Sequence, residues 1–181
     1  MLKVVAITGY KSFELGIYKN SDPAVQYIKK LLSRQIAQLA EEGLEWVIIS
    51  GQQGVELWGA EALIALQDQY PDLKLAVITP FLHQEEKWNE DNQQLYEKVI
   101  AHADYVASLS KQPYTAPWQF RNKNQFFLEK TNGAIILYDE EKEGSPKYYY
   151  QLAQNYREKQ PYEIRTIDFY DLQAIVDEDN F

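Results

Sequence analysis

The sequence predicts an α/β fold of the Rossmann-like type, with a three-layer, doubly wound and mainly parallel sheet and helices on both faces. Short β-branched runs alternate along the chain with longer amphipathic segments, which is typical of a parallel sheet covered by helices. The chain has 181 residues, of which 45% are hydrophobic, and this is enough for one sizeable core. We therefore expect a single domain over residues 1–181.

Six segments are predicted as strands. Each is a short run rich in apolar and β-branched residues, and a helical pattern separates it from the next run, as parallel crossovers require. The predicted strands are Lys3–Thr8, Trp46–Ser50, Lys74–Thr79, Asp104–Leu109, Ala134–Tyr138 and Glu163–Ile167.

The helix between the first two strands has clear boundary signals. Asp22 can cap its start, Pro23 suits its first position and Gly43 suits its end. Apolar residues recur on one face of it, namely Val25, Ile28, Leu32, Ile36 and Leu39. Further helices are predicted at Val55–Gln69, Glu90–His102, Trp118–Lys130 and Pro146–Glu158, with a short docked helix within Asp171–Phe181.

The composition limits the possible functions. The formal net charge is -9, which repels polyanions and anionic membranes, so neither nucleic acid nor a membrane is expected as a partner. Because there are no cysteines and only two histidines, thiol chemistry is excluded and no resident metal is expected. The apolar run after Met1 is too short for a signal peptide or a membrane span, so we expect a cytoplasmic protein.

The loops after the strands are where a ligand should bind, because open α/β sheets hold ligands beyond the carboxyl ends of their strands. After the first predicted strand, Thr8 and Gly9 form a turn and Lys11 offers a positive charge. After the second, Gly51 and Gly54 precede a helix, although such glycines also suit a plain turn. These loops are candidate ligand-binding segments.

Glu56 is the carboxylate closest to that helix start. The positive end of the helix dipole alone could explain a carboxylate there. A carboxylate also competes with phosphate for the exposed amides, so it is better suited to ribose hydroxyls or a base. We therefore expect phosphate to bind elsewhere.

Two other segments are candidates for phosphate binding. Gly144 and Ser145 precede a helix that begins with a proline, which leaves free amides for an anion, although Ser145 could instead be an ordinary N-cap. Arg121 or Lys123 could reach a phosphate, or both could be solvated. In the same segment Phe120, Phe127 and Leu128 fit a buried helical face.

Three motifs together resemble the YpsA family of small bacterial proteins: the turn TGYKSFELG at residues 8–16, SGQQGVELW at 50–58 and KNQFF at 123–127. The resemblance runs over nearly the whole chain. That family is similar in turn to a Rossmann-like superfamily with the DNA-processing protein DprA and the LOG phosphoribohydrolases, which release a base from a nucleoside monophosphate.

The resemblance implies a ligand site at Gly9, Gly51, Gly54 and Glu56, with Trp58 walling the pocket. LOG enzymes have a catalytic glutamate after a glycine-rich turn, and this sequence has Tyr148 at the matching position. Arg121 matches the LOG arginine on the preceding helix. Because the arginine is kept and the glutamate is lost, phosphate binding is favoured over hydrolysis.

We expect a binding protein, a sensor or regulator of a nucleotide or of a phosphoribosyl or ADP-ribose-like ligand. The alternative is an N-glycosidase acting on a nucleoside monophosphate, with Glu56 or Asp139 as the catalytic carboxylate. Single-strand nucleic-acid binding, by analogy with DprA, is opposed by the charge. The family resemblance also implies a protein partner in Gram-positive cell division.

Overall fold

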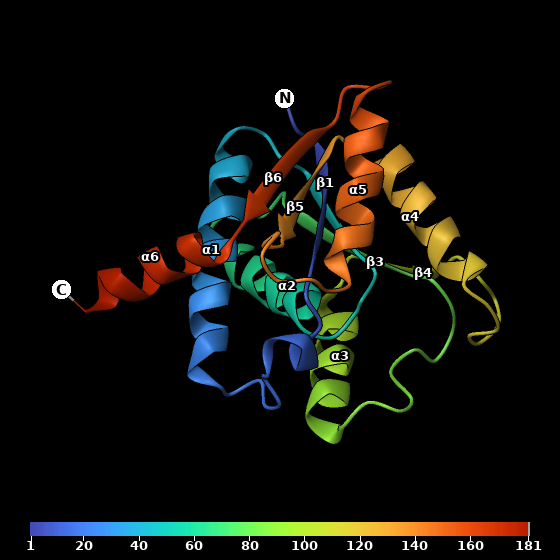
Figure 1. Cartoon of the computed structure of the whole chain (residues 1–181), viewed down its shortest axis with the longest axis horizontal. Helices are drawn as coiled ribbons and strands as arrows, with labels where there is room; N and C mark the ends of the chain where they lie inside the picture. The colour runs from blue at the N-terminus through green and yellow to red at the C-terminus, as the bar shows by residue number, and fades with distance from the viewer. Residues whose placement is uncertain (181) are drawn as a thin grey trace.

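The computed structural model describes residues 1–180 and contains one sheet of six parallel strands in the order β4-β3-β2-β1-β5-β6 (Figure 1). This confirms the predicted fold class. Phe181, the last residue of the predicted terminal helix, lies outside the described residues. The strands are β1 (Val4–Gly9), β2 (Trp46–Ile49), β3 (Lys74–Thr79), β4 (Tyr105–Ser108), β5 (Gly133–Leu137) and β6 (Glu163–Ile167).

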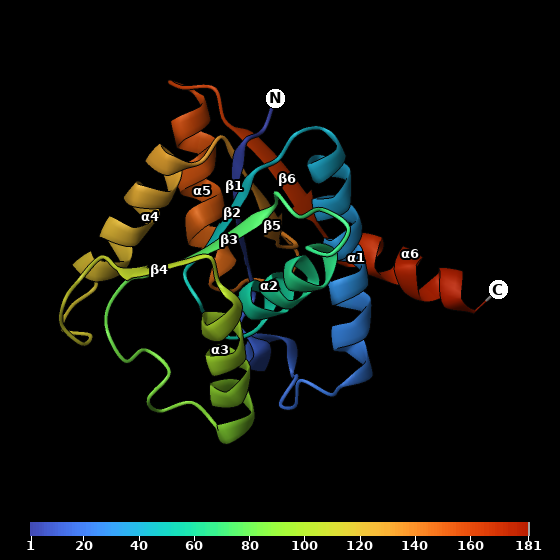
Figure 2. The same cartoon turned by 180° about the vertical axis from the view of Figure 1, so that it is seen from behind.

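The strand order reverses beside β1, and this determines which helix covers which face. Strands β2, β3 and β4 follow on one side of β1, whereas β5 and β6 lie on the other. Figures 1 and 2 show α4 and α5 side by side on one face of the sheet and α1, α2, α3 and α6 on the opposite face. The helices are α1 (Pro23–Glu41), α2 (Val55–Leu66), α3 (Glu90–His102), α4 (Trp118–Lys130), α5 (Pro146–Arg157) and α6 (Phe169–Asp179).

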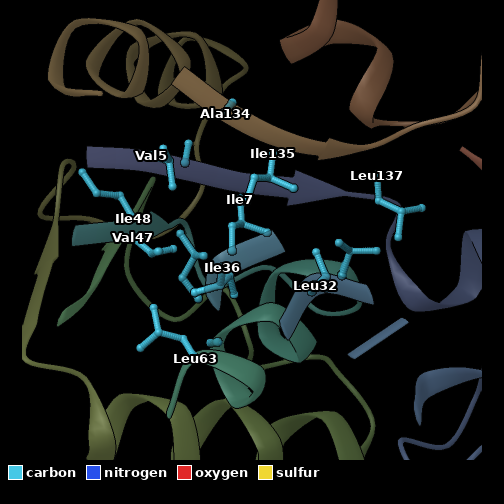
Figure 3. Close-up of a cluster of buried hydrophobic side chains, with 14 of the residues drawn as sticks. Val5, Ile7, Leu32, Ile36, Val47, Ile48, Leu63, Ala134, Ile135 and Leu137 are labelled. Atoms are coloured by element: carbon cyan, nitrogen blue, oxygen red, sulfur yellow. The ribbon is translucent and has the colours of Figure 1, made fainter. Parts of the chain in front are cut away.

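The core lies between the central strands and the first two helices. Ile7 of β1, Leu32 and Ile36 of α1 and Leu63 of α2 are completely buried, and Figure 3 shows these side chains gathered beneath the sheet. The apolar face predicted for α1 is the face that is buried. None of the helices within residues 1–180 is long and apolar enough to cross a membrane.

The structure corrects some element boundaries. Helix α2 ends at Leu66, and the Gln67 side chain then donates to the Leu73 carbonyl. Helix α6 begins at Phe169, because Asp168 and Asp171 form a reciprocal capping box. A short 3-10 helix, η1 (Ser12–Leu15), follows β1 and was not predicted.

Gly54 holds the loop after β1 against the start of α2. Its φ is 92°, a backbone conformation that favours glycine. The neighbouring Val55 amide donates to the Tyr10 carbonyl at 3.1 Å. A Cβ on Gly54 would lie 2.6 Å from both the Ser12 nitrogen and the Tyr10 oxygen. Because those atoms belong to the backbone, they can move aside only at a large cost in free energy.

Gly54→Ala should therefore destabilise the protein by about 3 kcal/mol or more, because it combines backbone strain with a collision against main-chain atoms. Gly16→Ala is the matched control, since Gly16 also has a positive φ (69°) but a Cβ there would meet no atom within 4 Å. Gly16→Ala should lower the free energy of unfolding by about 1 kcal/mol, because of its backbone conformation alone. Urea unfolding of both variants measures the difference. Equal costs would show that close packing around Gly54 is unimportant.

Candidate functional site

A cavity of about 630 Å³ opens at the carboxyl ends of the strands, beside α4 and α5. Its size is in the range of small-molecule and cofactor sites. Six of the predicted site residues line it: Thr8, Gly9, Lys11, Glu56, Arg121 and Ser145. The other lining residues are Ser50, Gln52, Pro80, Pro117, Phe120, Lys123, Asn124, Tyr148, Tyr149, Gln151, Leu152 and Asn155.

The carboxylate of Glu56 is fixed by the end of β2. Its side chain is 5% exposed, and Oε1 accepts from the Ser50 amide at 2.7 Å and the Ser50 hydroxyl at 2.8 Å. Oε2 accepts a long hydrogen bond, 3.5 Å, from the Thr8 hydroxyl. Burial raises the pKa of Glu56, against the opposing effects of Lys123 and of the hydrogen bonds from Ser50 and Gln52. One carboxylate oxygen is thus held firmly and the other is weakly engaged.

Lys123 brings a positive charge to the same cavity. Its ammonium lies over the rings of Phe127 and Tyr149, 5.5 and 6.0 Å from their centroids. Burial lowers the pKa of Lys123; attraction to Glu56 opposes this shift, and repulsion from Lys11 adds to it. The ion pairs formed within residues 1–180 do not include Lys123. Its charge is therefore near Glu56 without being in salt-bridge contact with it.

The amides expected to be free before α5 are partly used by the protein itself, which corrects that expectation. Glu14 of η1 accepts from the Ser145 amide at 2.8 Å and from the Ser145 hydroxyl at 2.6 Å. Although burial alone would raise it, the pKa of Glu14 is lowered, because these hydrogen bonds and one from the Lys11 amide stabilise the carboxylate. Ser145 begins α5 without capping it through its side chain. Glu14 occupies the position where an external anion was expected.

Five other predicted site residues do not line the cavity. Trp58 is completely buried, and its Nε1 donates to Asn20 Oδ1 at 2.8 Å, so it joins α2 to the loop before α1 rather than walling the cavity. Gly51 packs near the Gln84 and Tyr96 side chains. Gly54, as described above, lies against the backbone of the loop after β1.

Gly144 and Asp139 are also placed by packing. A Cβ on Gly144 would be 2.8 Å from the Tyr10 ring. The Asp139 side chain is turned toward backbone amides, accepting from Glu141 at 2.9 Å and from Phe169 at 3.1 Å. These hydrogen bonds connect the end of β5 to the start of α6. Asp139 therefore stabilises the fold and does not line the cavity.

Several lining residues were not predicted as site residues from the sequence. Pro117, Phe120 and Asn124 follow helical spacing along α4, and Tyr148, Leu152 and Asn155 do so along α5. The same periodicity predicts a buried helical face equally well, so it could not distinguish a cavity wall from core. Phe120, which was expected in the core, is only partly buried.

The raised pKa of Glu56 predicts a pH-dependent stability difference. A carboxyl whose pKa is raised on folding destabilises the folded state once it ionises, so the parent should lose stability relative to Glu56→Gln as the pH rises above the ordinary value of 4.5. Below that value the difference should be constant. Urea unfolding of both proteins between about pH 4 and 7 measures it. A parent that gains stability relative to Glu56→Gln over this range would mean that the hydrogen bonds and Lys123 outweigh burial.

Comparison with known proteins shows the fold and the family of the chain. A solved structure of DNA processing protein A from Helicobacter pylori, described for its single-stranded DNA binding mode, superposes with a TM-score of 0.52 at 13% identity, covering 96% of this chain and 79% of that one. At this identity the likeness shows the fold alone.

Sequence relatives are much closer. The chain is 55% identical over 180 residues to the UPF0398 protein YpsA of Bacillus subtilis (strain 168), covering 99% of this chain and 100% of the relative. It is 54% identical to a UPF0398 protein of Bacillus pumilus, covering 99% and 96%. The model of the YpsA family, described as the "YspA SLOG family", matches residues 5–172. The chain therefore belongs to the YpsA family of SLOG proteins.

Proposed function

We propose that the cavity beside α4 and α5 binds a phosphorylated ribose compound, a nucleotide or a nucleotide derivative, and that the protein acts as a sensor or regulator. One observation carries the proposal: a single cavity of nucleotide size contains a buried carboxylate with an available oxygen and several cationic side chains. The carboxylate suits ribose hydroxyls, and the cationic side chains suit phosphate.

Glu56 provides the ribose contact. Ser50 holds Oε1 through two short hydrogen bonds, so the orientation of the carboxylate is fixed before a ligand arrives. Oε2 then accepts from a ribose hydroxyl, and a charge-assisted hydrogen bond in a buried site is stronger than a neutral one. Thr8 lies within reach of the same oxygen.

Lys123, Lys11 and Arg121 provide the phosphate contacts. All three line the cavity, in a protein whose overall charge of -9 would otherwise repel an anion. Lys123 is the most suitable of the three, because its ammonium lies over the rings of Phe127 and Tyr149 and is not in salt-bridge contact with Glu56. A phosphate placed against it would favour the charged form of Lys123, which burial disfavours.

The lining also favours binding over hydrolysis. Glu56 is the only acidic residue among the lining residues that the structure describes, so the cavity has no second carboxyl group to divide the acid and base roles of an N-glycosidase. Asp139, the other candidate, has its carboxylate bound to two backbone amides. Tyr148 stands in the lining where the LOG pattern has glutamate. A sensor in the cytoplasm, acting on a partner protein in cell division, is the role that the family resemblance suggests.

Isothermal titration calorimetry with adenosine 5′-monophosphate and adenosine tests this proposal. Lys123→Met should weaken binding of the monophosphate about tenfold or more, because it removes a charge-assisted contact, and should weaken adenosine binding much less. Lys98→Met is the control, since Lys98 pairs with Glu61 on α2 and is absent from the cavity lining. It should leave both affinities unchanged.

Two results would contradict the proposal. One is an equal loss of affinity for adenosine and its monophosphate in Lys123→Met, which would mean that Lys123 does not contact the phosphate. The other is chromatographic detection of free adenine, formed from the monophosphate in proportion to the protein and abolished by Glu56→Gln, which would establish the N-glycosidase instead.

A further inference from the structure

We propose that the ring of Tyr148, with Leu152 beside it, is a stacking surface for the base of the bound compound; this inference rests on the proposed binding of a phosphorylated ribose compound. The starting observation is an exposed aromatic side chain inside the site. Tyr148 lines the cavity, and its exposed fraction is 70%. A large aromatic ring gains free energy when its surface is covered, and the base of a nucleotide covers such a ring by stacking on it.

The other aromatic rings of the lining are already covered by the protein. Tyr149 is 3% exposed, and its hydroxyl lies 2.8 Å from that of Tyr162. Phe120 is partly buried and packs edge-on against Phe81, with ring centroids 5.4 Å apart. The ring–ring contacts formed within residues 1–180 do not include Tyr148. Tyr148 is therefore the aromatic lining residue whose ring surface is most available to a ligand.

Leu152 extends this surface along α5. It lies four residues after Tyr148, and side chains at this spacing are neighbours on a helix. Leu152 also lines the cavity and is 40% exposed. A ribose phosphate, which is polar throughout, would leave this apolar surface in water, whereas the flat face of a base would cover it. The two side chains therefore favour a nucleotide over a bare sugar phosphate.

The chemistry of the two side chains also limits what the stacking surface can recognise. Stacking uses the π-face that every base has, whereas bases differ in the hydrogen-bonding groups on their edges. The Leu152 side chain has no hydrogen-bonding group, and Tyr148 contacts a stacked base through the face of its ring. The surface therefore distinguishes a nucleotide from a sugar phosphate but does not distinguish one purine from another.

The experiment compares three probes by calorimetry on the full chain: adenosine 5′-monophosphate, guanosine 5′-monophosphate and ribose 5-phosphate, which is the same phosphorylated sugar without a base. The parent should bind both nucleotides at least about tenfold more tightly than ribose 5-phosphate, because only the nucleotides can stack on Tyr148. The affinities for the two nucleotides should agree within about threefold, since stacking alone is tolerant of the base.

Variants of Tyr148 then identify the stacking ring. Tyr148→Ser should weaken both nucleotides about tenfold and leave ribose 5-phosphate unaffected, whereas Tyr148→Phe should retain the parent's affinity for all three probes. Tyr170→Ser is the matched control, because Tyr170 is 74% exposed in the first turn of α6 and lies outside the cavity lining. It should keep the parent's three affinities.

The comparison within the parent needs no variant, so a folding defect cannot obscure it. If the parent binds all three probes equally, the stacking surface is overturned while the proposed function stands. An equal loss for all three probes in Tyr148→Ser would also overturn it, because the loss would not depend on the base. A difference of more than about tenfold between the two nucleotides would overturn the tolerance of the base. If none of the three probes binds the parent, the stacking surface and the proposed function are both overturned.

Discussion

Strand β1 is the point on which the rest of the structure depends, because it pairs in parallel with β2 on one side and β5 on the other. This pairing places the reversal of strand order at β1. The chain must then return from edge strand β4 to β5 through α4, on the face opposite α1, and α5 follows beside α4. At such a reversal the loops diverge and a crevice forms beyond the strand ends. The cavity beside α4 and α5 follows from this topology.

The loop after β1 is positioned by contacts with segments far away in the sequence. The Tyr10 hydroxyl donates to the Lys142 carbonyl at 2.5 Å and accepts from the Asp139 amide at 3.0 Å. Glu14 binds the start of α5 through Ser145. Gly54 brings α2 against the same loop. These contacts therefore fix the relative positions of Glu56, Lys11 and the side of α5 that lines the cavity. Such preorganisation is what a binding site requires.

The fold could be predicted in detail because its signals are local. Runs of β-branched residues identified the strands, and the Asp22–Pro23 start and the Gly43 end of α1 are visible in the sequence, with Gly43 at a φ of 106° as a helix end requires. Glu56 could also be placed near the strand ends, because it follows a strand and a glycine turn. The sequence could not show which anion the start of α5 receives, since Glu14 and Ser145 are 131 residues apart.

The positions of Trp58, Lys123 and Asn124 also depend on contacts between segments that are distant in the sequence. Trp58 lies in the motif of Glu56, but helical geometry places it on the opposite side of α2 from Glu56, where Asn20 accepts from its indole nitrogen. Lys123 was an alternative to Arg121 as the phosphate contact, and nothing in the sequence distinguished the two or pointed to their neighbour Asn124. Their relevance depends on the packing of α4 against α5, which brings Tyr149 beneath the Lys123 ammonium.

A crystal structure of the complex with adenosine 5′-monophosphate tests the proposed site most directly. We expect a ribose hydroxyl within hydrogen-bonding distance of Glu56 Oε2 and the phosphate beside Lys123, between α4 and α5. A monophosphate bound instead in the second hollow, which is lined by Gln26, Lys30 and Glu61, or bound in the α4–α5 cavity with its phosphate directed away from Lys123, would contradict the assignment of the site.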